Sequence, residues 1–303
     1  MENTNQKYDL VIIGGGPAGS AAAVYAARKK IKSAIITTEF GGQSVVSDDI
    51  QNWIGTPHIS GMDLAKSLET HVKEYQGGIL HIIKELVSSI TQNEDKTFTI
   101  KTNKSEIHTR AILVATGSKR RKLEAKGADE FEHKGVTYCA SCDGPMYRDT
   151  AVAVIGGGNA AFESALQLAA YCTKVYILNR SESYRADEIT VDKAKSKENI
   201  EIINNAVVTE VFGEQFVKGL TYNNDQKLDV EGIFVEIGQI PNTDYINIVE
   251  KNNVGNIIVD PRTQRTSVEG VWAAGDCTDG LYHQNNIAVG DAVKALENIY
   301  VWL

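Results

Sequence analysis

A buried strand, a glycine-rich turn, a helix and a second strand follow one another twice along this 303-residue chain. In the first copy an apolar run over 8–13 leads into the turn Gly14–Gly19, and a helix is predicted over 20–30. A second strand is predicted over 33–37, with Glu39 just beyond it. Continuous apolar runs are typical of strands buried on both faces. The pattern therefore predicts a dinucleotide-binding βαβ unit within a parallel α/β fold.

Each residue type in the first turn has a physical reason. Gly14 permits the tight turn, Gly16 lets the backbone approach a pyrophosphate, and Gly19 lets the helix pack close to the sheet. The N-terminus of the helix offers amide donors and a partial positive charge to the phosphates. Glu39 is placed to accept a hydrogen bond from a ribose hydroxyl.

The second copy has a strand over 151–155, the turn Gly156–Ala161, a predicted helix over 162–171 and a strand over 174–178. Ala161 takes the place of the third glycine, a substitution that the pattern tolerates. One such turn is weak evidence, because a strand can meet a helix tightly without any ligand. Two complete copies are strong evidence, so we expect a flavin and a nicotinamide nucleotide, one in each copy.

Composition excludes some classes of function. With 42% hydrophobic and 23% charged residues, the chain is an ordinary globular protein with length for two domains. A net charge of -8 and a pI of about 5.4 give no electrostatic case for nucleic acid or an anionic membrane. The short basic run Lys119–Lys122 fits a solvated loop equally well. Strand-length apolar runs and a polar start predict a soluble, cytoplasmic protein without a signal peptide.

Two of the four cysteines, Cys139 and Cys142, form a Cys-x-x-Cys motif. In a cytosolic α/β chain this motif indicates a redox pair or half of a zinc site. No second motif or close histidine pair completes a zinc tetrahedron, so no metal is predicted. A helix start holds the two sulfurs within bonding reach and lowers a thiol pKa. Cys172, at the end of a predicted helix, is expected either to pack in the core or to be exposed, and Cys277 is expected to be a small buried residue.

Several further motifs occur in a family-specific order. They are Phe40–Gln43, Asn52–Gly55, Ala115–Gly117, Tyr138–Gly144, Gly232–Asn242, Ala274–Asp276 and His283-Gln284. With these motifs and its two glycine turns, the chain resembles the low-molecular-weight thioredoxin reductases and the related reductase domains of alkyl hydroperoxide reductase flavoproteins. The resemblance covers essentially the whole chain, and the Cys-x-x-Cys-Asp-Gly segment before the second turn is its most specific element.

The resemblance implies an α/β fold of two Rossmann-like dinucleotide-binding domains. An FAD-binding domain of residues 1–117 and 242–303 would be interrupted by an NAD(P)H-binding domain, residues 118–241, which carries the cysteine pair. The residues implied for FAD are Gly14, Gly16, Pro17, Ala18, Gly19, Glu39, Gly42, Gln43, Asn52, Ala115, Thr116, Gly117, Gly275, Asp276, Gln284, Asn285 and Ile287. Those implied for the nicotinamide nucleotide are Gly156, Gly158, Asn159, Ala160, Ala161, Arg180 and Arg185.

The resemblance also implies distinct roles at the cysteine pair. Cys142 would receive electrons from the flavin, Cys139 would attack the disulfide of a partner, and Asp143 would act as acid and base. Electrons would pass from NAD(P)H through FAD and the cysteines to thioredoxin or a similar small dithiol protein on a separate chain. Such enzymes are homodimers whose domains rotate, with candidate hinges here at 117–121 and 238–242.

The nicotinamide motif departs from the family. NADPH-using members carry His-Arg-Arg-x-x-x-Arg, whereas residues 179–185 keep only Arg180 and Arg185 and have Ser181 between them, followed by Glu182. Two guanidinium groups still favour a phosphate, while the carboxylate favours a free ribose. NADPH is our first expectation, and use of both nucleotides or of NADH is the alternative.

Two other functions compete with this interpretation. One is an NADH-linked reductase of a glutaredoxin-like partner that serves a peroxidase, because residues 144–146 and 236–241 resemble those relatives. The other is a flavin redox protein, such as a sensor, whose electron donor is not NAD(P)H, an alternative that the reduced arginine set leaves open. Bleaching of the flavin absorption by NAD(P)H separates the two classes.

Overall fold

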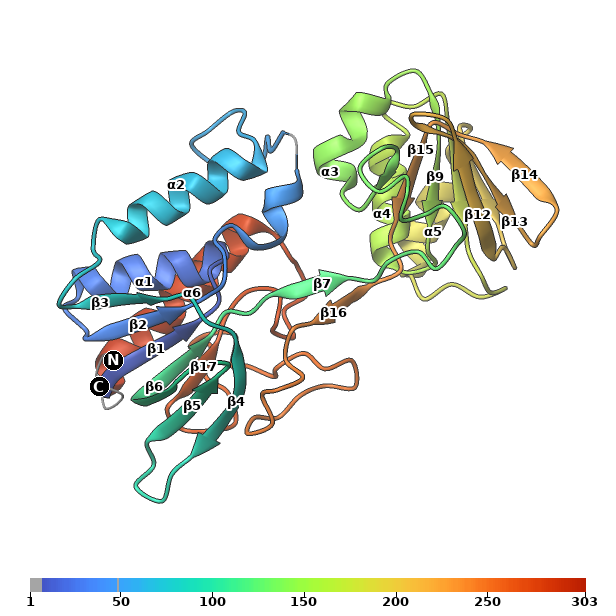
Figure 1. Cartoon of the computed structure of the whole chain (residues 1–303). Coiled ribbons are helices and arrows are strands. Elements are labelled where there is room, and N and C mark those ends of the chain that lie inside the picture. The colour runs from blue at the N-terminus through green and yellow to red at the C-terminus, as the bar shows by residue number, and fades with distance from the viewer. Residues whose placement is uncertain (1–6, 48) are drawn as a thin grey trace. The chain divides into compact units, whose positions relative to one another are not determined.

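The computed structural model describes residues 7–47 and 49–303, which form two compact units (Figure 1). Unit 1 contains the chain up to Lys119 together with Ile240–Leu303, and unit 2 is Arg120–Gln239. The chain passes between them through β7 (Ser118–Arg120) and β16 (Gln239–Pro241), which pair as a two-stranded sheet.

Unit 1 is built on a seven-stranded sheet of order β3-β2-β1-β6-β5-β4, with β17 also paired to β6. Strands β3, β2, β1 and β6 run parallel to one another. Strands β4 and β5 form an antiparallel hairpin, and β5 pairs antiparallel with β6. The strands are β1 (Lys7–Ile13), β2 (Ser33–Ile36), β3 (Leu80–Ile83), β4 (Val87–Gln92), β5 (Phe98–Thr102), β6 (Glu106–Val114) and β17 (Val271–Ala273).

Helices α1 (Pro17–Arg28) and α6 (Asn285–Trp302) lie side by side on one face of this sheet, with α2 (Gly61–Lys73) nearby (Figure 1). Alanines dominate the buried stripe of α1, so the helix packs closely on the strands. A short 3-10 helix, η1 (Gly42–Val46), follows β2. The opposite face of the sheet packs against the irregular segment around Ile246 and Ile257.

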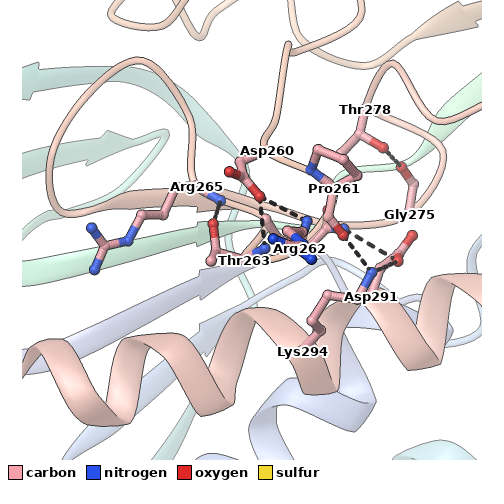
Figure 2. A network of polar contacts seen from close by, with 10 residues as sticks. Asp260, Pro261, Arg262, Thr263, Arg265, Gly275, Thr278, Asp291 and Lys294 are labelled. Atoms are coloured by element: carbon pink, nitrogen blue, oxygen red, sulfur yellow. Dashed lines mark hydrogen bonds and ion pairs between the residues drawn. The ribbon is translucent and has the colours of Figure 1, made fainter.

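Figure 2 shows the polar network that fixes α6 in unit 1. Lys294 Nζ donates to the Pro261 backbone oxygen at 2.8 Å and pairs with Asp291 at 3.1 Å. In the same network the Thr278 hydroxyl donates to the Gly275 backbone oxygen at 2.8 Å. This bond closes the turn after β17, and a Cβ on Gly275 would lie only 3.2 Å from the Cβ of Ala288, so the turn packs against the first turn of α6.

Unit 2 contains five parallel strands in the order β11-β10-β9-β15-β8. They are β8 (Val136–Thr137), β9 (Ala151–Ile155), β10 (Lys174–Leu178), β11 (Ile200–Ile203) and β15 (Gly232–Val235). One face packs against an antiparallel sheet of β12 (Val208–Gly213), β13 (Val217–Tyr222) and β14 (Gln226–Asp229). The other face carries α3 (Ala140–Asp143), η2 (Gly144–Tyr147), α4 (Asn159–Leu168) and α5 (Glu188–Lys195).

The predicted fold class is confirmed, with small differences at the helix ends. Both turn-following helices begin three residues earlier than predicted, α1 at Pro17 and α4 at Asn159. Proline suits the first helical position because it has no N–H to leave unpaired there. Gly16 and Gly158 are the extended residues that precede these helices. No helix among the described residues is long and apolar enough to cross a membrane.

Candidate functional site

The glycine turn of unit 1 is compressed between β1, α1 and the end of β6. A Cβ atom on Gly14, whose φ is 115°, would lie 2.2 Å from the Ala115 backbone oxygen. A Cβ on Gly19 would lie 1.8 Å from the Gly14 backbone oxygen. No described side chain caps Gly16 at the start of α1, so the first amides of the helix are open to an anion.

A cavity of about 530 Å³ lies at the carboxyl ends of the unit 1 strands. Most of the residues predicted for FAD line it, and they come from five separate stretches of the chain. The predicted residues in its wall are Gly14, Gly16, Pro17, Ala18, Glu39, Gly42, Gln43, Ala115, Thr116, Gly117, Gly275, Asp276 and Asn285.

Four predicted FAD residues, Gly19, Asn52, Gln284 and Ile287, lie outside the cavity wall. Gly19 supports the turn from behind. Asn52 Nδ2 donates to Gln284 Oε1 at 3.0 Å, which ties the segment after η1 to the residue that precedes α6. Ile287 is 39% exposed on α6.

Sequence reasoning missed several residues of this wall, among them Glu85–Val87, Lys119, Asn242 and Tyr245. Glu85–Val87 follow β3 as Glu39 follows β2, and the rule that ligands lie at carboxyl ends of parallel strands offered a signal for them. Tyr245 gave no such signal. Burial, with a contribution from Cys277, raises the pKa of this phenol, so it is neutral in the cavity wall.

The glycine turn of unit 2 repeats the arrangement with different neighbours. A Cβ on Gly156 would lie 2.4 Å from the Glu236 backbone oxygen, and one on Gly157 would lie 2.2 Å from Asn179 Oδ1. The amide of buried Asn179 donates to the backbone oxygens of Ser181 at 2.6 Å and Ser183 at 3.2 Å. Asn179 therefore holds the loop after β10 against the turn.

This turn opens on a cavity of about 660 Å³ within unit 2. Of the predicted nucleotide residues, Gly156, Arg180 and Arg185 line it. The other predicted residues, Gly158, Asn159, Ala160 and Ala161, form the start of α4 outside the wall. Residues that were not predicted complete the wall, among them Arg121, Lys122, Leu123, Glu124, Gly157, Asn179, Ser181, Ser183 and Glu236.

Two polar residues near this cavity, Glu182 and Asn159, have other hydrogen-bond partners. Glu182 is not in the wall, and its carboxylate accepts a hydrogen bond from Asn205 Nδ2 at 2.7 Å. Asn159 Nδ2 donates to the Asp187 carboxylate at 3.1 Å, and Asn159 Oδ1 accepts from the Asp187 amide at 2.7 Å. The second contact pins the start of α4 to the start of α5.

The cysteine pair follows β8 on the same sheet. Cys139 and Cys142 are joined as a disulfide, with a Cα–Cα distance of 5.3 Å. Cys139 precedes the single-turn helix α3, and its Sγ accepts a hydrogen bond from the Cys142 amide at 3.2 Å. Both cysteines are partly exposed. Because α3 spans only four residues, it has no long helix dipole. In the reduced form, the Cys142 amide is the group that would stabilise a Cys139 thiolate.

Asp143 lies at the end of that turn. Its amide donates to the Cys139 backbone oxygen at 3.0 Å, and its carboxylate accepts a hydrogen bond from the Thr137 hydroxyl on β8. Burial, together with the Asp143 charge, raises the pKa of Tyr147 to about 12. The carboxylate is thus anchored to β8 by Thr137, and its charge contributes to the raised pKa of Tyr147.

The candidate binding and redox groups of unit 2 all lie at the carboxyl ends of its parallel strands, along one edge of the sheet. The arginine loop follows β10, the glycine turn follows β9, Glu236 follows β15, and the disulfide follows β8. Ligands of open parallel sheets bind along this edge. A dinucleotide at the glycine turn would therefore run between the arginines and the cysteine pair.

The two other cysteines, and a third cavity among the described residues, give no comparable arrangement. Cys172 and Cys277 are buried, and burial raises the pKa of each thiol to about 11. No cluster of possible metal ligands occurs among the described residues. A further cavity, of about 670 Å³, lies beside the β4–β5 hairpin; it is lined by polar chains such as Asn93 and His108 and contains no glycine turn.

Known proteins share this architecture. Residues 8–292 match the family "Pyridine nucleotide-disulphide oxidoreductase". Solved thioredoxin reductases from Streptococcus pyogenes MGAS5005 and Giardia duodenalis superimpose with TM-scores of 0.87 and 0.89, at 33% and 32% identity. Each comparison covers 98% of this chain, and 98% and 99% of the respective structures.

The chain belongs to this family. It is therefore an oxidoreductase of the pyridine nucleotide-disulphide class, whose members in general use FAD and NAD(P)H. The predicted resemblance is confirmed. The chain is also 40% identical to an alkyl hydroperoxide reductase subunit of Escherichia coli (strain K12) and 36% identical to an NADH dehydrogenase of Bacillus subtilis (strain 168). These matches cover 99% and 98% of the chain but only 59% of each relative.

The cavity in unit 1 of this oxidoreductase fits FAD. Its uncapped α1 start offers amides for a diphosphate, and Gly16 lies open opposite the Cα of Gly42, where a Cβ would be 4.0 Å away. Glu39 in the wall can accept from a ribose. When bound, FAD supplies two-electron transfer between a hydride donor and a dithiol.

Proposed function

We propose that this chain is a disulfide reductase that binds FAD in unit 1 and NAD(P)H in unit 2 and reduces a thioredoxin-like protein through Cys139 and Cys142. The observation that carries the proposal is the disulfide at the carboxyl end of β8, on the edge that also bears the glycine turn. An electron donor and a redox disulfide thus have neighbouring sites on one sheet.

The dithiol form of the pair can perform the exchange with its own residues. The Cys139 thiolate attacks one sulfur of the partner's disulfide, which forms a mixed disulfide and releases one partner thiolate. The Asp143 carboxylate accepts the proton of the Cys142 thiol and passes it to that partner thiolate. The Cys142 thiolate then attacks Cys139, which restores the Cys139–Cys142 disulfide and releases the second partner thiolate. The two electrons that leave the pair now reside on the partner's two thiols.

The wall of the unit 2 cavity supports NADPH as the preferred donor. Gly15 packs against Thr37 in unit 1 as Gly157 packs against Asn179 in unit 2, so Glu39 and Ser181 occupy equivalent positions two residues later. The acid that would bind a free 2′-hydroxyl is thus a serine in unit 2. Arg180 and Arg185 line the cavity, while Glu182 binds Asn205 instead.

The partner, the assembly and the location are parts of the same proposal. Two solved thioredoxin reductases match the chain over nearly their whole length, which supports a thioredoxin-like partner on a separate chain. We extend to this chain the homodimer, the domain rotation and the cytoplasmic location that its resemblance implies.

The 40% identity to the alkyl hydroperoxide reductase of Escherichia coli supports a second candidate. In that case NADH would be the donor, and the partner would be a glutaredoxin-like protein that serves a peroxidase. The ratio of kcat/KM for NADPH to that for NADH separates the two candidates. A ratio above about ten supports the first, and a ratio below one overturns our choice of nucleotide.

The test of the function uses purified flavin-loaded protein and a panel of small dithiol proteins. In Cys142→Ser we expect NADPH still to bleach the flavin absorption, while reduction of every partner is lost. Cys172→Ser is the matched control, because Cys172 is buried and its Sγ bonds the Tyr147 backbone oxygen, a contact that serine can keep. Unchanged turnover in Cys142→Ser would remove the pair from the mechanism, and a colourless protein unable to take up FAD would refute the function.

A further inference from the structure

Glu236 is a carboxylic acid in the wall of the unit 2 cavity that the proposed reaction does not use. It follows β15 directly, its amide donates to the Ile155 backbone oxygen at 2.8 Å, and its own backbone oxygen is the contact that excludes a side chain at Gly156. Phe234 on β15 pairs with Thr137 on β8, and Glu236 and Cys139 each follow two residues later, just past the ends of these strands. Glu236 therefore lies between the glycine turn and the redox pair.

The side chain of Glu236 is largely withdrawn from water. Its carboxylate accepts a hydrogen bond from the Ser164 hydroxyl at 2.8 Å, which lies in the second turn of α4. Burial raises the pKa of Glu236 to about 7, against smaller opposing effects of Ser164 and Arg120. At neutral pH the group is therefore divided between a carboxylate and a neutral acid.

A dinucleotide at this turn would place its diphosphate at the start of α4. Ser164 lies five residues after Asn159, so its partner carboxyl is roughly 8 Å along the helix from those phosphates. A carboxylate at that distance repels the diphosphate, whereas a protonated acid does not and can donate a hydrogen bond.

We propose that Glu236 makes nucleotide binding proton-linked, so that the site binds its nucleotide together with one proton taken up by this side chain. The inference rests on the proposed nucleotide site of unit 2. It adds that this site binds the nucleotide better when Glu236 is protonated. Affinity then falls as the pH rises, because the carboxylate must first be neutralised. A shift of about one pKa unit on binding corresponds to an affinity change of about tenfold.

The other charged groups around Glu236 do not replace it in this role. Arg120 at the end of β7 attracts the carboxylate, and Glu163, exposed beside Ser164 on α4, repels it. The turn after β9 brings only Ile155 and glycines. At the end of β8 the cysteines are held as a disulfide, which takes up no proton in the oxidised protein.

The experiment is calorimetric titration of oxidised, flavin-loaded protein with NADP⁺ between pH 6 and pH 9. Each titration is repeated in two buffers of different ionisation enthalpy, which counts the protons taken up. Between pH 6 and pH 9 the affinity of wild type for NADP⁺ should fall about tenfold more than the affinity of Glu236→Gln. The glutamine amide keeps the size of the side chain without titrating. Taking this difference cancels the titration of the nucleotide's own 2′-phosphate, which affects both proteins.

Two further variants make the result specific. Ser164→Ala removes a bond that favours the carboxylate, so the pH at which affinity falls should move upward. Glu231→Gln removes an exposed carboxylate just before β15, outside the cavity wall, and should leave the profile of wild type in place. If Glu236→Gln does not fold, the shift in Ser164→Ala decides the question alone.

The outcomes separate this inference from the proposed function. Binding of NADP⁺ with the same pH profile in wild type and Glu236→Gln overturns the role of Glu236 and leaves the nucleotide site standing. Absence of binding by both NADP⁺ and NAD⁺ at every pH refutes the nucleotide site itself. Proton uptake that persists unchanged in Glu236→Gln assigns the proton to another group and also overturns the inference.

Discussion

Gly19→Ala is the smallest change that should separate the unit 1 turn from its flavin. The added Cβ would lie 1.8 Å from the Gly14 backbone oxygen and 2.8 Å from its carbonyl carbon. Cβ atoms keep at least 3.0 Å from such atoms, so α1 and the turn must separate by more than 1 Å. Both neighbours are backbone, and Ala115 lies directly behind the turn, so neither can swing aside.

The size of the effect follows from two opposing terms. Overpacking against rigid backbone falls in the upper part of the usual range, about 2–3 kcal/mol, and the better helix propensity of alanine returns about 1 kcal/mol. The net loss of about 1–2 kcal/mol corresponds to a fall in Tm of about 2–8 °C for a domain of this size. The flavin should suffer more, because the displaced α1 amides lose charge-assisted hydrogen bonds of about 1.5–3 kcal/mol each to the diphosphate.

The assay measures flavin content after purification, then FAD affinity by titration of the stripped protein. We expect FAD binding to weaken at least about tenfold in Gly19→Ala. Gly78→Ala is the matched control, because a Cβ there meets nothing within 4 Å and the backbone needs no positive φ. Full flavin content and an unchanged Tm in Gly19→Ala would refute the close-packing argument for this turn.

Four further substitutions probe unit 2. Arg180→Ala and Arg185→Ala should each lower kcat/KM for NADPH about 10- to 100-fold and leave the value for NADH unchanged, as measured by steady-state rates with both nucleotides. Thr137→Val removes the hydroxyl that binds Asp143 and should slow dithiol exchange, but not flavin bleaching, in stopped-flow measurements. Because folding raises the pKa of Glu236 from 4.5 to about 7, its carboxylate destabilises the fold above pH 7, and this effect disappears as the pH falls towards 4.5. Glu236→Gln should therefore stabilise the protein by up to about 3 kcal/mol at pH 8 and by less than about 1 kcal/mol at pH 5, as thermal unfolding at the two pH values would show.

The elements that the sequence predicted best are those with short-range causes. The strand at 151–155 and the turns at Gly14 and Gly156 are found as expected, because continuous apolar runs and paired glycines determine local structure. The helix starts were placed three residues late because Pro17 and Asn159 were assigned to the turns. Proline is favoured at the first helical position and asparagine at the N-cap just before it, so the sequence contained the information needed to place these starts to within a residue.

Residues of the cavity walls that were missed come together only through tertiary packing. Arg121 belongs to a basic run that fitted a solvated loop, yet it lines the unit 2 cavity beside the arginine loop. Tyr245 reaches the unit 1 cavity from an irregular segment far from the glycine turn in sequence. No local pattern marks such residues, since their place depends on which loops the strand order brings to one edge.

The two units also explain how one local device can hold different dinucleotides. Their turns share the glycines that the backbone geometry demands, while the residues just after the second strand differ: Thr37 and Glu39 in unit 1, Asn179 and Ser181 in unit 2. The first pair offers a carboxylate in the cavity wall, and the second offers a hydroxyl within an arginine-bearing loop. On the proposed function, phosphate binding would be common to both units because glycine and helix termini provide it, whereas the choice of ribose chemistry would lie in side chains that can change without disturbing the fold.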